Sequence, residues 1–150
     1  MSVYRVEKSE QPVTVHLYDQ GMRQGVVFLS PNSCTLCGAQ SVLELLREKT
    51  RFLPFRNQQG ELTLINKEVI TYIGFQPTED EIPPLVCDEV DVRIVFFGGE
   101  LLEGTILLDQ PAGKNRLLDY VNAFPGFFAV RGKNRRFVAN GSMVQEVTPR

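Results

Sequence analysis

Alternating apolar and polar side chains predict that most of this chain forms β-strands. Val13–Leu17 alternates with period two, which is typical of a strand with one buried face. The turn signal Asp19–Gly21 separates it from a second apolar segment, Gly25–Leu29, so the two segments predict a β-hairpin. Farther on, the apolar residues of 41–49 recur at helical spacing and predict a short amphipathic helix.

Three more strands are predicted after this helix. Phe52–Arg56 returns to a strand pattern, and we expect it at a sheet edge because Pro54 has no amide hydrogen to donate to a neighbouring strand. Two short strands are predicted next, at Leu62–Ile65 and Val69–Ile73.

The second part of the chain repeats this order of elements. Equivalent positions are Gly25 and Gly104, Phe52 and Phe127, and Asn66 and Asn140. The spacing between copies falls from 79 to 75 residues between the second strand and the helix, where Leu43 corresponds to Leu118, and to 74 at the asparagines. The agreement lies in element order and apolar positions rather than in identities, and it indicates an internal duplication. The alternative is two unrelated β-rich stretches of similar composition.

The predicted fold class is therefore mainly β, or α+β by content. It consists of two tandem small bent-sheet or barrel units, each β-β-α-β-β-β, packed pseudo-symmetrically. The boundaries that we expect are a lead-in at 1–12, a first repeat at 13–74, an acidic linker with several prolines at 75–89, and a second repeat at 90–147.

Composition and charge narrow the range of partners. The chain has 150 residues, of which 43% are hydrophobic and 23% charged, and its net charge is −2. Such a balance gives no overall attraction to nucleic acid or to an anionic membrane. The apolar runs are shorter than the roughly 18 residues that cross a bilayer, and the first residues lack the apolar core of a secretory signal. We expect a cytoplasmic protein without a membrane partner.

The second copy also carries a recognisable motif. Its segment 92–106 reads Val-x-Ile-x-Phe-x-Gly-Gly-x-x-Leu-x-Gly-x-Ile, which resembles the first motif of Sm-like proteins. The segments 66–73 and 140–147 are similar to the short second motif of that family. The resemblance implies a bent five-stranded barrel related in shape to the SH3 barrel.

The same resemblance implies an RNA site at the first turn and the second motif. The matching positions are Asp19, Gly21, Asn66 and Lys67 in the first copy, and Gly98, Gly99, Asn140 and Gly141 in the second. Three departures accompany it. The helix lies between the second and third strands instead of before the first, Gly21 falls one place later than Gly99, and the second copy has no basic residue where the first has Lys67.

A pair of cysteines forms the sharpest local motif. Cys34 and Cys37 stand at the spacing that chelates a metal or forms a redox pair. A tetrahedral zinc site needs four ligands, and only Cys87 and His16 remain in the chain, so zinc would require a site shared across a dimer. The alternative is a surface loop with chance cysteines.

Charge is unevenly spread within the second half of the chain, where residues 113–136 hold six basic side chains and one acidic side chain. Together with Lys67, the candidate ligand or RNA contacts are Lys114, Arg116, Arg131, Lys133, Arg135 and Arg136. The segment 133–136 falls in a predicted hairpin turn, so its side chains should be exposed to phosphates or to an acidic partner. The alternative is a solvated loop that complements the acidic linker of the same molecule.

The sequence favours a protein that is not an enzyme. His16 is the only histidine and is expected to be a solvated strand residue, and no catalytic arrangement or phosphate-binding glycine motif stands out. We expect an adaptor or regulatory module without a cofactor, which binds a protein partner or forms a homo-oligomer through its duplicated scaffold. Two alternatives stay open: an Sm-like RNA-binding protein, and a metal or thiol-redox protein that uses Cys34 and Cys37.

Overall fold

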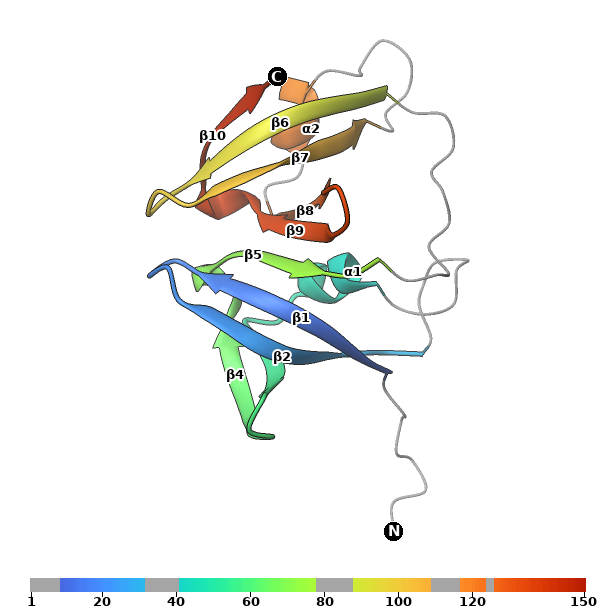
Figure 1. Ribbon diagram of the computed structural model, residues 1–150, viewed down its shortest axis with the longest axis vertical. Helices are drawn as coiled ribbons and strands as arrows, with labels where there is room; N and C mark the ends of the chain where they lie inside the picture. The colour runs from blue at the N-terminus through green and yellow to red at the C-terminus, as the bar shows by residue number, and fades with distance from the viewer. Residues whose placement is uncertain (1–8, 32–40, 78–87, 109–116, 124–125) are drawn as a thin grey trace.

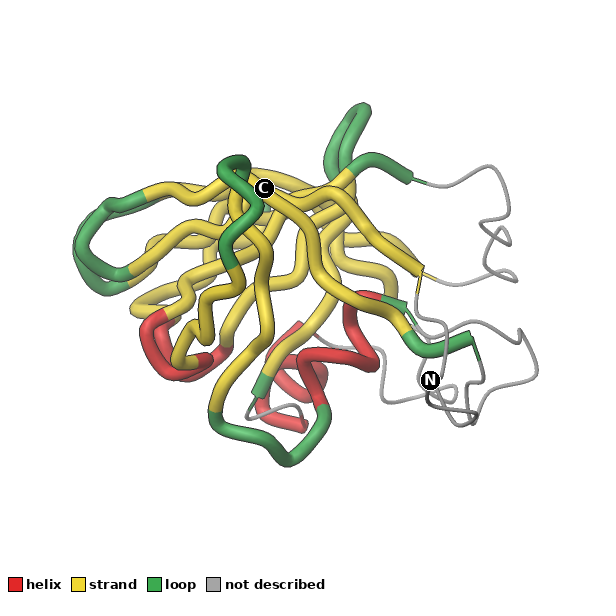
Figure 2. Tube along the Cα trace, turned by 90° about the horizontal axis from the view of Figure 1, so that it is seen from below, coloured by secondary structure: helices red, strands yellow, loops and turns green. Residues whose placement is uncertain are grey.

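The structure, a computed structural model, describes residues 9–31, 41–77, 88–108, 117–123 and 126–150. Within these residues ten strands form one open antiparallel sheet with the order β10-β6-β7-β8-β9-β5-β1-β2-β3-β4. Figure 1 shows the two sequence halves stacked along the long axis of the molecule, with β5 and β9 facing each other at the middle. Figure 2 shows that the strands bend and that the helical segments lie along one side of them.

The two halves have the same order of elements, which confirms the prediction of a repeated, mainly β pattern. The first half contains β1 Ser9–Leu17, β2 Met22–Leu29, α1 Val42–Arg47, β3 Phe52–Asn57, β4 Leu62–Asn66, the 3₁₀ turn η1 Lys67–Val69, and β5 Ile70–Phe75. The second half contains β6 Asp88–Phe96, β7 Leu101–Leu108, α2 Leu117–Ala123, β8 Phe127–Arg131, β9 Arg136–Asn140, η2 Gly141–Met143, and β10 Val144–Pro149.

The repeat extends to single backbone hydrogen bonds. The amide of Tyr18 donates to the carbonyl of Val69 at 2.8 Å, and at the equivalent place the amide of Phe97 donates to the carbonyl of Met143 at 2.9 Å. Each half also has an irregularity where its first strand meets its last, between β1 and β5 and between β6 and β10. The common element order therefore reflects a common backbone geometry.

The turns of the two long hairpins explain why Gly21 falls one place later than Gly99. Gly99 adopts a φ of 93°, a region that favours glycine, and its equivalent Gln20 adopts a φ of 66°. The first turn therefore uses the same left-handed geometry with a non-glycine residue, and Gly21 is not its counterpart.

Pro54 does not lie in an edge strand, contrary to the sequence prediction. β3 lies between β2 and β4. Its pairing with β2 is limited to Asn57 and Arg56, whereas Pro54 pairs only with Leu64 of β4. The missing amide hydrogen is tolerated because β2 has already diverged from β3 at this point, so an interior strand accepts a proline.

Strand residues on both sides enter the predicted linker. β5 ends at Phe75 and β6 begins at Asp88. β1 likewise begins at Ser9, inside the predicted lead-in. Among the described residues, no helix is long and apolar enough to cross a membrane.

Two apolar cores form, and each takes side chains from both halves. The first contains α1 residues such as Leu46 packed on β1 and β3, and it also contains Phe127 and Val138 of the second half. The second core contains Ile94 and Phe128, and it includes Tyr72 of the first half. The exchange of side chains joins the halves into a single packed body.

A glycine at the same place in each half allows the strands to approach closely. A Cβ at Gly25 would lie 2.1 Å from the carbonyl oxygen of Arg56, and one at Gly104 would lie 2.8 Å from that of Arg131. Real Cβ atoms do not come so near to a backbone oxygen. The bend of β2 over β3, and of β7 over β8, therefore depends on the missing side chain.

We expect Gly25→Ala to lower the free energy of unfolding by at least ~2 kcal/mol, because the backbone of β2 and β3 must separate to admit the methyl group. Gly126→Ala is the matched control, since a Cβ there would meet nothing within 4 Å. Urea unfolding of both variants measures the difference, and equal stabilities would contradict the packing argument.

Candidate functional site

The central feature of the molecule is the pairing of β5 with β9, which we call the internal joint. The paired residues are Tyr72 with Ala139, Ile73 with Val138, Gly74 with Phe137, and Phe75 with Arg136. This joint makes one continuous sheet from strands of the two halves.

A buried asparagine, Asn140, forms hydrogen bonds across one end of the internal joint. The side-chain amide of Asn140 donates to the carbonyl of Ile70 at 2.9 Å and to that of Lys67 at 3.3 Å. Its side-chain oxygen accepts the amide of Ser142 and caps η2. Asn140 is buried. Because its amide nitrogen and its side-chain oxygen are both hydrogen-bonded, these bonds favour one relative position of the two halves.

A polar and aromatic cluster spans the two halves beside the joint. His16 stacks on Tyr72 with ring centroids 4.1 Å apart, and its Nδ1 lies 3.1 Å from a carboxylate oxygen of Glu100. The other carboxylate oxygen accepts a hydrogen bond of 3.0 Å from the hydroxyl of Thr71. Tyr72 also stacks on Phe96 of the second core. His16 is therefore not the solvated strand residue that the alternation predicted, because Tyr72 of β5 and Glu100 of the second half cover it.

The environment of Tyr72 disfavours its phenolate. Burial and then the nearby Glu100 carboxylate raise the pKa of Tyr72 to about 12, while Arg135 acts in the opposite direction. The neutral ring is the form that the internal joint accommodates.

The sheet ends in two strands with one open side each. Among the described strands, β4 pairs only with β3, and β10 pairs only with β6. On β4 the side chains of Leu62 and Leu64 are exposed to solvent. An open edge with exposed apolar side chains is a template for pairing with another strand.

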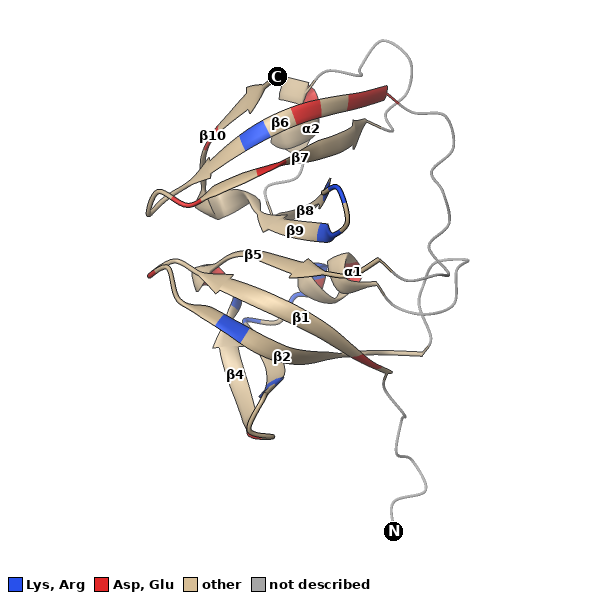
Figure 3. Ribbon diagram, in the orientation of Figure 1, with Lys and Arg blue, Asp and Glu red and all other residues tan. Residues whose placement is uncertain are grey.

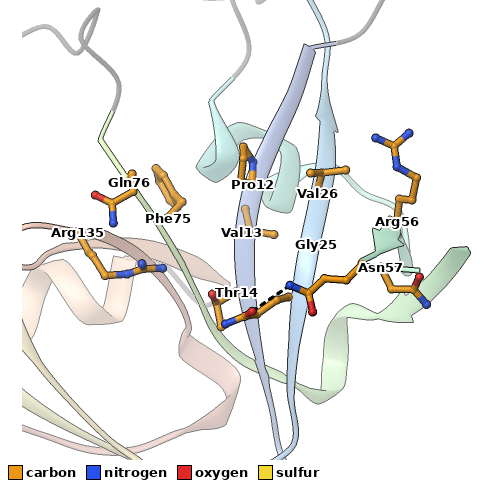
Figure 4. A pocket seen from close by; sticks show the side chains of 12 residues that line it. Pro12, Val13, Thr14, Gly25, Val26, Arg56, Asn57, Phe75, Gln76 and Arg135 are labelled. Atoms are coloured by element: carbon orange, nitrogen blue, oxygen red, sulfur yellow. Dashed lines mark hydrogen bonds between the residues drawn. The ribbon is translucent and has the colours of Figure 1, made fainter. Parts of the chain in front are cut away.

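Two hollows lie at equivalent places in the two halves. The first, of about 430 Å³, is shown in Figure 4, with Arg56 and Asn57 on one side of β1 and β2 and Arg135 on the other. The second, of about 560 Å³, is lined by the equivalent residues Gly104 and Arg131. Both hollows form where β2 or β7 bends away at its glycine.

An ion pair at each bend is also repeated. Arg56 pairs with Glu10, and its equivalent Arg131 pairs with Glu89 at 2.9 Å. The side chains are partly exposed, so each pair contributes at most about 1 kcal/mol to stability. The recurring ion pair gives a structural role to Arg56 and to Arg131, of which Arg131 is one of the candidate ligand contacts.

The structure separates the basic residues that the sequence grouped as ligand contacts. Arg131, Lys133 and Arg136 line the second hollow, whereas Arg135 lines the first. Figure 3 shows basic residues, coloured blue, at the tip of the β8–β9 hairpin and acidic residues, coloured red, at the start of β6. The candidates Lys114 and Arg116 lie outside the described residues.

Lys67 has a structural role that the sequence did not reveal. Its side chain is only 7% exposed. The ammonium group donates to the Thr50 hydroxyl at 2.8 Å and to the carbonyls of Glu48 at 3.1 Å and Leu45 at 3.5 Å. Lys67 therefore caps the C-terminal end of α1, and its ammonium group is not presented to an external ligand. The pKa of Lys67 is lowered, because burial disfavours its charged form more than the nearby charge of Glu48 stabilises it.

Cys34, Cys37 and Cys87 all lie outside the described residues. Within the described part of the chain, no group of three or more metal-ligating side chains gathers. The metal or thiol-redox reading stays a prediction from the sequence.

Sequence reasoning did not find the internal joint, although a signal for it exists. β5, with the sequence ITYIGF, is buried on both faces, whereas the equivalent β10, with VQEVTP, is mostly exposed. A strand without polar alternation is typical of a central position in a sheet. The contrast between the two closing strands indicates that β5 has a neighbour on each side.

Comparison with known proteins adds no identification: no family model, curated protein or solved structure matches the chain.

We expect Lys67→Ala to lower the free energy of unfolding by roughly 1–3 kcal/mol, because it leaves buried acceptors at the end of α1 without a donor. Lys49→Ala removes an exposed lysine two residues after this helix and should change stability by less than about 0.5 kcal/mol. Denaturant unfolding measures both. Equal effects would show that Lys67 does not cap the helix.

A second prediction concerns alkaline pH. The pKa of Tyr72 is raised in the folded state to about 12, above the roughly 10 of an unfolded chain. The stability that comes from its neutral ring is fully present below pH 10 and is lost as pH rises through 12. Tyr72→Phe should lose less stability than the wild type over this interval, by at most roughly 2–3 kcal/mol, because solvent screening reduces the effect of the shift. Urea unfolding at stepped pH values tests this, and parallel profiles would contradict it.

Proposed function

We propose that the protein is a non-enzymatic scaffold that binds a polypeptide by adding a strand at the open edges of its sheet, in an adaptor or regulatory role. The observation that carries this proposal is the open side of β4 with Leu62 and Leu64 exposed along it. Backbone groups of an edge strand supply affinity, and alternate side chains supply selectivity. The duplicated scaffold offers a second open strand in β10.

The scaffold itself supports this role. We propose that each half is a small bent-sheet unit, and the support is the glycine bend that recurs at Gly25 and Gly104. The polar groups nearest to a catalytic arrangement, His16 and Glu100, are tied into the stack on Tyr72 between the halves. They line neither hollow, so they serve the joint better than they would serve a substrate.

The RNA-binding alternative draws on the basic side chains around the second hollow. It requires Lys67 and the 133–136 turn to share an exposed face, but the ammonium group of Lys67 is held by hydrogen bonds at the C-terminal end of α1. Glu89 pairs with Arg131, and Glu103 pairs with Arg150 at 2.7 Å, which lowers the positive potential there. A salt-dependent mobility shift with short RNA would favour this alternative, and the absence of binding at low salt would remove it.

Selection from a library of random linear peptides tests strand addition directly. Recovered peptides should be extended and apolar at alternate positions, and binding at β4 should be lost in the double variant Leu62→Lys, Leu64→Lys, because edge lysines oppose pairing. Leu101→Lys is the matched control, since Leu101 is an exposed apolar residue of the interior strand β7. Peptides that bind the wild type and both variants equally would rule out β4 as the binding edge.

A further inference from the structure

The two open edges of the sheet match each other. We propose that β4 of one chain pairs with β10 of a second copy, antiparallel and in the register that β9 and β5 adopt inside each chain. This inference rests on the proposed function, because it names the partner for the same edges. We choose a second copy of the chain as the partner because the internal joint already pairs the equivalent strands, β9 and β5.

Because the two halves are equivalent, the register of the internal joint can be transferred to the open edges. β9 ends at Asn140 and β4 at Asn66, a spacing of 74 (140 − 66). β10 begins at Val144 and β5 at Ile70, again 74 (144 − 70). The register of the internal joint then predicts these pairs between chains: Glu146 with Ile65, Val147 with Leu64, Thr148 with Thr63, and Pro149 with Leu62.

Apolar side chains are exposed on β4 and β3 where their repeat equivalents are buried. Leu64 is 59% exposed, whereas Val138, its equivalent, is 1% exposed because it packs into the core of the other half. Phe52 is 46% exposed, and its equivalent Phe127 is 8% exposed in that same core. The internal joint covers these positions once per chain, and the second set remains open.

The other edge shows the complementary exposure. Leu43 of α1 packs against the core that receives Phe127, and α1 contacts β8 across the internal joint. Arg47 of α1 also donates to the carbonyl of Phe127 at 3.0 Å. The equivalent of Leu43 is Leu118 of α2, which is 64% exposed beside the second core. A second copy seated on β10 would bring its Phe52 to this helix.

Asn66 supplies a polar counterpart at the same edge. Both asparagines cap their 3₁₀ turn through the side-chain oxygen. The amide nitrogen of Asn140 bonds across the internal joint to Lys67 and Ile70. The amide nitrogen of Asn66 donates to no acceptor among the described residues. The proposed pairing offers it the carbonyls of Gly141 and Val144 of the second copy.

The facing side chains differ between the two joints in a compensating way. At the internal joint Gly74 faces Phe137, and a Cβ on Gly74 would lie 3.1 Å from that ring. At the open edges Thr148 would face Thr63. The larger side chain at the first position is offset by a smaller one at the second, and facing threonines form a favourable cross-strand pair.

Pairing of this kind is head-to-tail, because the two surfaces are different. Each added copy leaves one β4 and one β10 open, so chains extend until the rotation between copies closes them. A two-fold symmetric dimer, in which identical edges meet, is a different arrangement and gives a different outcome in the experiment.

The test uses two full-length variants, each blocked at one edge. Leu62→Lys with Leu64→Lys blocks β4, and Leu118→Lys with Thr148→Glu blocks the β10 side; all four positions are exposed. Sedimentation velocity measures the wild type, each variant alone and an equimolar mixture. We expect the wild type to associate, each variant alone to be monomeric, and the mixture to form a one-to-one dimer. Formation of that dimer also shows that both variants are folded.

The control is Leu101→Lys, which should associate like the wild type. A wild type that stays monomeric over a wide concentration range overturns the inference. Self-association of either blocked variant at wild-type strength also overturns it, because it shows another interface. If peptides selected on β4 still bind, the proposed function stands while the self-pairing fails; loss of both removes the proposed function as well.

Discussion

The pairing of β5 with β9 is the contact on which the rest of the structure depends. Each half of the chain is small, and a unit of that size buries little apolar surface by itself. The internal joint increases the buried apolar surface of each half, because Phe127 and Val138 complete the first core while Tyr72 completes the second. Neither core has its full set of side chains without the other half. The joint therefore contributes to stability through packing as well as through backbone hydrogen bonds.

The same contact determines which surfaces stay open. A sheet unit has two edges, and the internal joint covers one edge of each half. The uncovered edges are then necessarily the other pair, β4 and β10. Soluble proteins usually protect such edges with charge, proline or a covering element. Here Pro149 ends β10 and Glu146 lies within it, whereas β4 exposes Leu62 and Leu64. Of the two open edges, β4 therefore has the fewer features that oppose strand pairing.

Local patterns in the sequence predicted the strands, the first helix and the repeated order, because each depends on neighbours a few residues away. The features that were missed depend on contacts across the fold. His16 was expected in solvent because its own strand alternates, yet Tyr72 and Glu100 cover it from elsewhere. Lys67 was assigned to a ligand site, yet it caps a helix 19 residues earlier in the chain. Residue type alone did not distinguish a buried ammonium group from an exposed one.

Comparison of the two closing strands shows how a duplicated unit can divide its roles. A joint inside one chain is always formed, so β5 and β9 can be apolar without risk to solubility. In the proposed assembly β10 pairs only when a second copy arrives, so this edge must also be stable in water while it is open. Its side chains are accordingly more polar than those of β5: Tyr72 and Gly74 on β5 correspond to Glu146 and Thr148 on β10. The two copies keep the backbone geometry and differ in side-chain polarity. That difference is expected where one joint is permanent and its counterpart is reversible.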